Sequence, residues 1–310
     1  MLAVADLHLS YGKTNVLSGL SFSVDPGEIV GIIGNSGIGK TSLLKLMSGY
    51  LDSSSGNVFI DGREILGPSQ KLVPGYEEIQ LVNQDFELDV NQTVEENIRG
   101  KILHMNKLDQ QELVDEALDL VELEGIRSRC AKVLSGGEKQ RLSIARALVC
   151  EPKYLLMDEP FVHLDQRLRL KITNYLLKLN EIRNITIVLV SHDGSELLGF
   201  VNRLIHLGEG TIIRDAAPLT IYYSPDDKEQ GELLGILNEV KLEGETVLFR
   251  PNEYSINDQN AIISLVFERS IDSGMLVLNY FKTKTNETIV LSANASLSGL
   301  KTISILKHES

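Results

Sequence analysis

The sequence predicts an α/β protein in which a large domain with a mostly parallel sheet is followed by a smaller, all-β domain. Up to about Asp215, short apolar runs alternate with segments of helical periodicity, and this alternation favours a parallel sheet with crossover helices. Beyond that point, the apolar runs at 246–251, 261–271 and 275–283 are strand-like and have no helical pattern between them. The length of 310 residues suits one large and one small domain.

The first segments of the chain predict strands. The alternating runs "LAVADLHL" and "LSFSV", both between residues 2 and 33, are typical of an antiparallel opening, and "DPGE" at 25–28 predicts a turn. The apolar run "EIVGIIG" at 28–34 predicts a buried strand. Two more short strands are expected from "NVFIDG" at 57–62 and "IQLVNQ" at 79–84.

The octapeptide "GNSGIGKT" follows the buried strand and precedes "KTSLLKLMSG", which predicts a helix over 40–49. It matches G-x-x-x-x-G-K-[ST], the P-loop pattern, in which glycines let backbone N–H groups surround phosphates, the lysine neutralises them and the hydroxyl ligates Mg²⁺. A strand before the loop and a helix after it are the context that this motif requires. The residues expected to bind the phosphates are Gly34, Asn35, Ser36, Gly37, Ile38, Gly39, Lys40, Thr41 and Ser42, with Thr41 as the Mg²⁺ ligand.

A mostly helical segment follows. Asp109 and Glu112 have the spacing of an acidic capping box, and the apolar residues behind them recur at helical spacing, which predicts a helix over Gln110–Leu123. Further along, 167–182 has helical periodicity, and 186–192 predicts a strand. A hairpin is expected over 203–213, with its turn at 208–210.

A second acidic strand end is needed beside a P-loop, because Mg²⁺ has few direct protein ligands and the attacking water needs a base. The segment "YLLMDEP" at 154–160 supplies it. Four apolar residues place Asp158 at the end of a buried strand, where it can hold the Mg²⁺ shell, and the neighbouring Glu159 can polarise water.

Composition excludes some classes of partner. The net charge of −13 opposes phosphate backbones, so nucleic acid is not expected as a partner. The two cysteines, Cys130 and Cys150, are too few for a zinc site or a disulfide scaffold and are expected to be buried thiols. Since no apolar run is long enough for a membrane span and no leader is evident, we expect a soluble, cytoplasmic protein.

The segment "LSGGEKQRLSIARAL" at 134–148 is a loop of small residues that opens a helix, so its N–H groups can receive an anion. Two such helix starts in one chain are unusual. Together with the P-loop and "YLLMDEP", this segment resembles the ATPase subunit of ATP-binding cassette (ABC) transporters, whose signature motif is L-S-G-G-Q or L-S-G-G-E. The resemblance covers about residues 2–215 and implies a P-loop NTPase fold with a helical subdomain.

The resemblance implies roles for further residues. Tyr11 in "SYG" resembles the aromatic that stacks on adenine, Gln84 in "VNQD" the glutamine that senses Mg²⁺ and contacts the membrane partner, and His192 in "VLVSHD" the switch histidine on the γ-phosphate. In the family, two subunits pair head to tail across ATP. The P-loop of one then faces Ser135, Gly136 and Gly137 of the other.

Two regions depart from the family pattern. The loop usually written S-A-L-D is "FVHLD" here: Asp165 is kept, and His163 is either a tolerated interface substitution or a sensor of the opposite site or of pH. The tail resembles a short form of the OB-like domain appended to importer subunits for ferric iron, polyamines and inorganic anions, and its alternative reading is a β-appendage that only adds core or dimer contacts. The expected division is an ATPase domain over 1–224, with a helical subdomain at about 93–135, and an accessory domain over 231–310.

The leading hypothesis for the function is an ATP-hydrolysing subunit of an ABC importer. The resemblance implies ATP and Mg²⁺ as cofactors, a homodimer in the ATP state, an integral membrane permease and an external substrate-binding protein as partners, and a peripheral location at the inner face of the cell membrane. The alternative is a soluble ABC ATPase that serves protein assembly or repair without transport. Against it stand the single cassette, the importer-like tail and the lack of coiled-coil segments.

Overall fold

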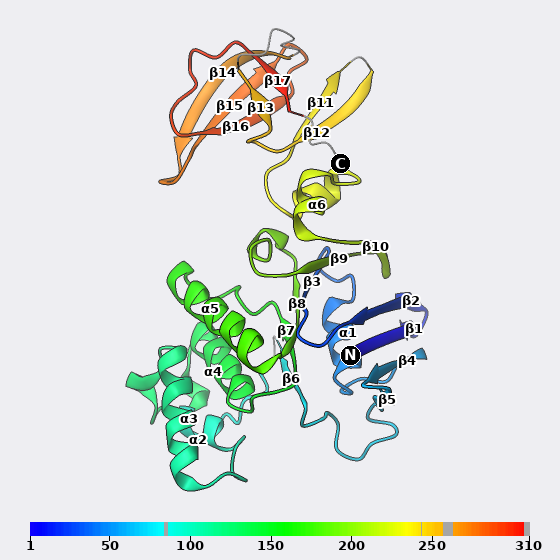
Figure 1. The fold of residues 1–310 in the computed structure, drawn as a ribbon, viewed down its shortest axis with the longest axis vertical. Coiled ribbons are helices and arrows are strands. Elements are labelled where there is room, and N and C mark those ends of the chain that lie inside the picture. The colour runs from blue at the N-terminus through cyan, green and yellow to red at the C-terminus, as the bar shows by residue number, and fades with distance from the viewer. Residues whose placement is uncertain (84–85, 243, 257–262, 307–310) are drawn as a thin grey trace. The chain divides into compact units, whose positions relative to one another are not determined.

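The structure is a computed structural model that describes residues 1–83, 86–242, 244–256 and 263–306. The chain divides into two compact units, the first made of 1–192 with 199–215 and the second of 193–198 with 216–310. Figure 1 shows both units, with elements of each labelled where there is room. The α/β class expected for the first unit and the all-β character expected for the tail are both confirmed.

A six-stranded sheet forms the centre of the first unit, in the order β10-β9-β3-β8-β7-β6. Its middle strand β3 pairs in parallel with β8 on one side and β9 on the other. Every residue of β3, β7 and β8 is buried, which explains why these strands are continuous apolar runs rather than alternating ones. The strand bounds are β3 Ile29–Ile33, β6 Ile79–Val82, β7 Tyr154–Asp158, β8 Thr186–Ser191, β9 Arg203–Gly208 and β10 Thr211–Ala216.

A second, antiparallel sheet in this unit has the order β2-β1-β4-β5. Its strands are β1 Leu2–Tyr11, β2 Thr14–Val24, β4 Ser55–Ile60 and β5 Arg63–Glu64. One hydrophobic cluster joins the two sheets, since it contains Leu20 and Val58 from this sheet together with Leu156 and Val188 from the central one. The expected antiparallel opening is therefore confirmed, and it packs on the sheet that carries the P-loop.

The helices of the first unit are α1 Lys40–Met47, α2 Val94–Arg99, α3 Lys107–Leu120, α4 Gly136–Leu148 and α5 Gln166–Arg183, with short 3₁₀ turns at Glu124–Ile126 and Ala131–Val133. The predicted start of α3 is wrong by one turn. Asn106, not Asp109, caps this helix, because its side chain accepts hydrogen bonds from the backbone N–H groups of Leu108 and Asp109 at 3.1 Å each. The acidic pair that the sequence suggested as a cap lies inside the helix.

The second unit contains a two-stranded sheet and a five-stranded sheet of order β13-β17-β14-β15-β16. Its elements are the 3₁₀ turn Gly194–Glu196, α6 Pro218–Tyr223, α7 Lys228–Glu232, β11 Asn238–Leu242, β12 Glu245–Phe249, β13 Tyr254–Ser255, β14 Ile263–Asp272, β15 Val277–Thr283, β16 Thr288–Ala293 and β17 Thr302–Ile305. Phe249, Phe281 and Ile289 lie in a separate hydrophobic core. The unit thus has its own core, as the sequence predicts; the OB-like resemblance stays a prediction.

A buried arginine directly after β12 links α6 to the segment before β11 in the second unit. Arg250, which has no exposed surface, donates from Nε to the carbonyl oxygen of Tyr222 at 2.7 Å and from Nη1 to those of Gly235 and Ile236 at 3.1 Å each. Its guanidinium carbon also lies 4.1 Å from the centre of the Tyr222 ring. Burial lowers the pKa of Arg250, yet these carbonyl oxygens replace part of its lost hydration.

Two further expectations concern the whole chain. Both cysteines are free thiols, but each is only half-buried, so the expectation of buried thiols is wrong in degree. Among the described residues, none of the helices combines the length and the apolar character that crossing a membrane requires.

Candidate functional site

The P-loop connects β3 to α1, and its glycines have backbone angles that other residues rarely adopt. Gly37 and Gly39 have φ values of +82° and +104°. A Cβ atom on Gly39 would lie only 2.8 Å from side-chain carbons of Val16 and Leu17. The loop therefore needs glycine both for its left-handed backbone and for close packing against β2.

Lys40 opens α1 and is almost fully buried. Its ammonium donates to the carbonyl oxygens of Gly34 at 2.6 Å and Asn35 at 3.0 Å, so the loop itself holds the amine in place. Burial lowers the pKa of Lys40, while the charges of Glu159 and Asp158 raise it. A buried cation surrounded by carbonyl oxygens and carboxylates is suited to exchange some of these partners for a phosphate.

Asp158 ends β7 beside the loop and is 2% exposed. Burial raises the pKa of its carboxyl group, whereas a hydrogen bond from Thr41 and the nearby charge of Lys40 lower it. Its Oδ2 atom is buried and has no hydrogen-bond partner among the described residues. A buried carboxylate oxygen without a partner, next to a threonine hydroxyl, is the donor set that suits a hard divalent cation such as Mg²⁺.

Glu159 follows directly and has a left-handed backbone with φ of +46°. This conformation costs a non-glycine residue about 1 kcal/mol or more, and it is held by the hydrogen bond from the Glu159 backbone N–H to the Val190 carbonyl oxygen at 3.0 Å. The side chain is 15% exposed, and its Oε2 lies 2.9 Å from Nδ1 of His192. The structure thus brings together the two residues that the sequence predicts for water activation and γ-phosphate sensing.

These groups surround an open pocket of about 590 Å³. The predicted residues that line it are Tyr11, Ser36, Gly37, Gly39, Lys40, Thr41, Ser42, Glu159 and His192. Tyr11 is 55% exposed, so its ring is available for stacking. Val16 also lines the pocket; the sequence analysis missed it, and its only signal is its place in the strand that follows Tyr11.

Of the predicted site residues that the structure describes, seven are not part of this lining: Gly34, Asn35, Ile38, Asp158, Ser135, Gly136 and Gly137. Gly34, Asn35 and Ile38 belong to the loop behind it, where the first two supply the carbonyl oxygens that hold Lys40. Gln84 lies outside the described residues. Its predicted contacts with Mg²⁺ and with a membrane partner therefore stay predictions.

The signature residues form a separate feature at the start of α4. Ser135 caps the helix, and Glu138 completes a reciprocal capping box: the Ser135 backbone N–H and hydroxyl donate to Glu138 Oε2 at 2.7 and 2.8 Å. Among the described residues that line the nucleotide pocket, none comes from this segment. The sequence pattern Ser-x-x-Glu signals such a box, but the sequence analysis assigned no role to Glu138.

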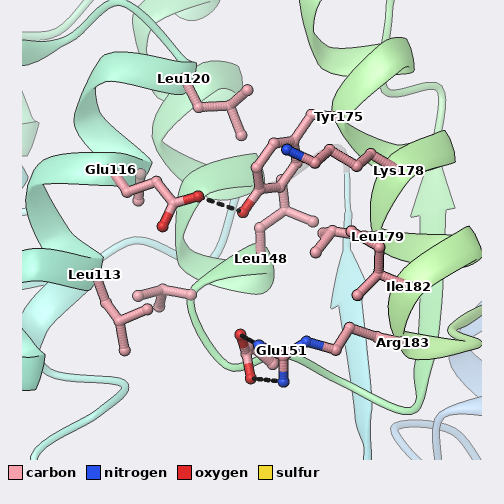
Figure 2. Close-up of a pocket in the computed structure, with 12 residues that line it drawn as sticks. Leu113, Glu116, Leu120, Leu148, Glu151, Tyr175, Lys178, Leu179, Ile182 and Arg183 are labelled. Atoms are coloured by element: carbon pink, nitrogen blue, oxygen red, sulfur yellow. Dashed lines mark hydrogen bonds and ion pairs between the residues drawn. The ribbon is translucent and has the colours of Figure 1, made fainter.

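A second cavity, of about 200 Å³, lies among α3, the C-terminal end of α4 and α5 (Figure 2). Its wall is mainly aliphatic, with Leu113 and Ile182 on opposite sides in Figure 2, and two polar pairs border it. Tyr175 donates to Glu116 at 3.4 Å, and Arg183 pairs with Glu151 at 2.9 Å. None of these residues belongs to the predicted nucleotide site, so this cavity is where α3 packs against α5 rather than part of the phosphate chemistry.

Comparison with known proteins identifies the relatives of the chain. The ABC transporter family profile matches residues 17–162. The chain is 33% identical over 268 residues to the spermidine/putrescine import ATP-binding protein PotA of Legionella pneumophila, covering 86% of this chain and 70% of that protein. It is 32% identical over 267 residues to the sulfate/thiosulfate import ATP-binding protein CysA of Pectobacterium atrosepticum, covering 83% and 79%.

Solved structures of ATP-binding cassettes are also similar to this chain. The dimeric post-hydrolysis structure of the ATP-binding cassette MJ0796, bound to ADP and Pi, has a TM-score of 0.64 at 29% identity and covers 70% of this chain and 99% of that chain. The structure of cbiO1 from Clostridium perfringens, part of the ABC transporter complex cbiONQ, has a TM-score of 0.59 at 28% identity and covers 71% and 90%.

Proposed function

This chain belongs to the family of ABC transporter ATP-binding subunits and is an ATPase, and on that premise we propose that it drives an importer as a head-to-tail homodimer on a membrane permease. One observation carries the proposal. The nucleotide pocket contains the P-loop, Glu159 and His192, while the second anion-receiving helix start lies elsewhere on the same chain. A second copy is therefore needed to bring the two together across one ATP.

The residues of the pocket divide the binding of ATP among them. Lys40 and the N–H groups of the loop hold the phosphates, and the exposed Tyr11 ring stacks on the adenine. Thr41 and Asp158 would hold Mg²⁺, which would supply electrostatic stabilisation of the phosphate oxygens. Gln84 is proposed to complete this shell.

Glu159 acts as the general base. Its carboxylate accepts the proton of the attacking water, and the left-handed backbone aims it into the pocket instead of along the strand. His192 lies within hydrogen-bond distance of the same carboxylate, so it orients Glu159 and contacts the γ-phosphate. Across the dimer, the partner's signature segment closes the site with Ser135, Gly136 and Gly137.

The names of the relatives support the proposed direction of transport and the proposed partners. PotA and CysA are named as import proteins, and the 268 matched residues of PotA exceed the length of the first unit, so the likeness extends into the tail. We therefore place the subunit at the inner face of the membrane, bound to a permease that receives cargo from an external binding protein. The tail then serves as the accessory domain.

Mixing two inactive subunits tests the composite site. Lys40→Ala disables one P-loop, and Ser135→Arg blocks one signature segment. A heterodimer of the two keeps one intact site, so ATP-dependent pairing is expected in the mixture and in neither variant alone. Light scattering with Mg²⁺ and ATP measures it. Pairing by Ser135→Arg alone, or no pairing in the mixture or the wild type, contradicts the proposal.

A further inference from the structure

At the start of α4, Glu138 binds the same serine that the proposed function assigns to the partner's phosphate. Its Oε2 atom accepts hydrogen bonds from both donors of Ser135, the backbone N–H at 2.7 Å and the hydroxyl at 2.8 Å. The Glu138 backbone N–H in turn donates to the Ser135 hydroxyl oxygen at 3.3 Å. The hydroxyl that would donate to the partner's ATP is therefore already bound to a carboxylate of its own chain.

The negative charge of Glu138 also opposes phosphate binding at Ser135. The positive end of a helix favours one anion at its first turn, and a carboxylate accepting two donors there satisfies that preference. An incoming γ-phosphate would meet both an occupied serine and a like charge. These effects act on the same few atoms, so phosphate and carboxylate cannot both use the Ser135 hydroxyl proton.

We propose that Glu138 is a positioning residue that acts as an internal stand-in for the γ-phosphate and must release Ser135 when the partner subunit's ATP arrives. This inference rests on the proposed head-to-tail dimer. It assigns the signature segment two states: closed on Glu138 in the single subunit, and open to phosphate in the dimer. The carboxylate thereby raises the ATP concentration at which subunits pair.

Arg129 provides a place for the released carboxylate. Its Nη1 lies 3.9 Å from Glu138 Oε1, the oxygen that does not bind Ser135. The Arg129 side chain is 58% exposed, so it can move towards the carboxylate without breaking a packed core. Turning the carboxylate towards Arg129 frees the Ser135 hydroxyl and neutralises the charge next to the phosphate.

The chain contains a matched control in α2. Thr93 and Glu96 form the same reciprocal box, in which the Thr93 backbone N–H and hydroxyl donate to Glu96 Oε2 at 2.8 Å each. This box starts a helix to which no nucleotide role is assigned. Glu96→Gln therefore reproduces the structural change of Glu138→Gln without touching the proposed competition.

The experiment measures ATP-driven dimerisation of the full chain in a Glu159→Gln background, where slow hydrolysis preserves the dimer. Light scattering across an ATP titration gives the half-maximal concentration. We expect Glu138→Gln to lower it about fivefold, since the amide still caps the helix but carries no charge. Glu96→Gln should leave it unchanged, and Arg129→Gln should raise it about twofold. Nucleotide affinity of the monomer, measured with a fluorescent ATP analogue, should be equal in all variants.

The outcomes separate the two proposals. Suppose that the Glu159→Gln chain dimerises in the presence of ATP, but Glu138→Gln dimerises at no lower ATP concentration than Glu96→Gln. The stand-in role of Glu138 is then refuted, and the proposed head-to-tail dimer is not. If that chain binds ATP but never pairs, both are refuted. A lower half-maximal concentration for Glu138→Gln alone, with a smaller difference at high salt, supports the stand-in.

Discussion

Two helix starts are proposed to receive phosphate, α1 after the P-loop and α4 after the signature serine, and they are capped in opposite ways. At α1 the cap is Gly39, and no side chain of the described residues makes a capping hydrogen bond there. At α4 the cap is Ser135, and Glu138 closes a complete capping box over it. One start is left open by its own sequence, whereas the other is occupied.

Under the proposed function, this difference explains how one chain would bind ATP alone yet need a second copy to complete the site. An open helix start with a buried lysine is ready for phosphate before any partner arrives. A start covered by a carboxylate is stable in the single subunit, because its donors are satisfied. In the proposal, it accepts phosphate only by exchange with Glu138, and pairing of the subunits then depends on ATP.

The largest effect is expected from Glu159→Gln, which traps the state in which both helix starts contact the same phosphate. An amide can orient water but cannot accept its proton, so hydrolysis should fall by about 100-fold or more. Nucleotide binding should persist, and a stable dimer should accumulate. Phosphate release and light scattering check this. Normal turnover would remove Glu159 from the role of base.

Lys40→Ala tests the uncapped helix start of α1. Removing a buried charge that faces the phosphates should weaken ATP binding by the single subunit at least tenfold. Lys139→Ala is the control, since Lys139 lies in the first turn of α4 and is not expected to contact the nucleotide of its own subunit. Titration of the monomer with a fluorescent nucleotide measures both. An equal loss of ATP affinity in both variants would mean that the start of α1 is not the only one of the two that binds nucleotide in the single subunit.

A pair of glycine substitutions tests why each start needs glycine. Gly39→Ala places a Cβ atom 2.8 Å from Val16 and Leu17 at a φ of +104°, and should destabilise the fold by about 2 kcal/mol or more. At Gly136 a Cβ meets nothing within 4 Å, so Gly136→Ala should change stability by less than about 0.5 kcal/mol. Its cost should appear only in ATP-dependent pairing. Chemical denaturation of the monomers decides, and a large loss of stability for Gly136→Ala would contradict this.

The smallest expected effect is a change of thermal stability with pH. The hydrogen bonds from Ser135 and Thr93 lower the pKa values of Glu138 and Glu96, led by the backbone N–H in both. A lowered pKa contributes stability above the ordinary value of 4.5, and this contribution is lost as pH falls through the folded value. Glu138→Gln and Glu96→Gln should each melt slightly earlier than wild type near pH 7, and the difference should narrow towards about pH 4. A difference that grows on acidification would exclude these bonds as its cause.

The sequence predicted the central sheet, the P-loop and the acidic strand end because their signals are local: spaced glycines, a lysine and threonine, and an apolar run before Asp158. It placed the start of α3 wrongly because Asp109 competes with Asn106 as a cap, and only the backbone geometry decides between them. The 2.9 Å contact between His192 and Glu159 joins the ends of two different strands, so no spacing in the sequence could give it. The capping box of Ser135 and Glu138 follows from the Ser-x-x-Glu spacing. It was not predicted, because the glycines between these two residues drew attention to anion binding instead.

The contacts of Arg250 bear on where a truncated version of the chain should end. A chain that ended near Ser224, as the expected domain boundary suggests, would keep α6 but lose the guanidinium that binds its Tyr222 carbonyl oxygen. The orphaned segment would then expose Ile221, which is fully buried in the intact unit. Fusion proteins and shortened versions for crystallisation should therefore end after β10 and before α6, which begins at Pro218, so that α6 is not separated from the strands on which it packs.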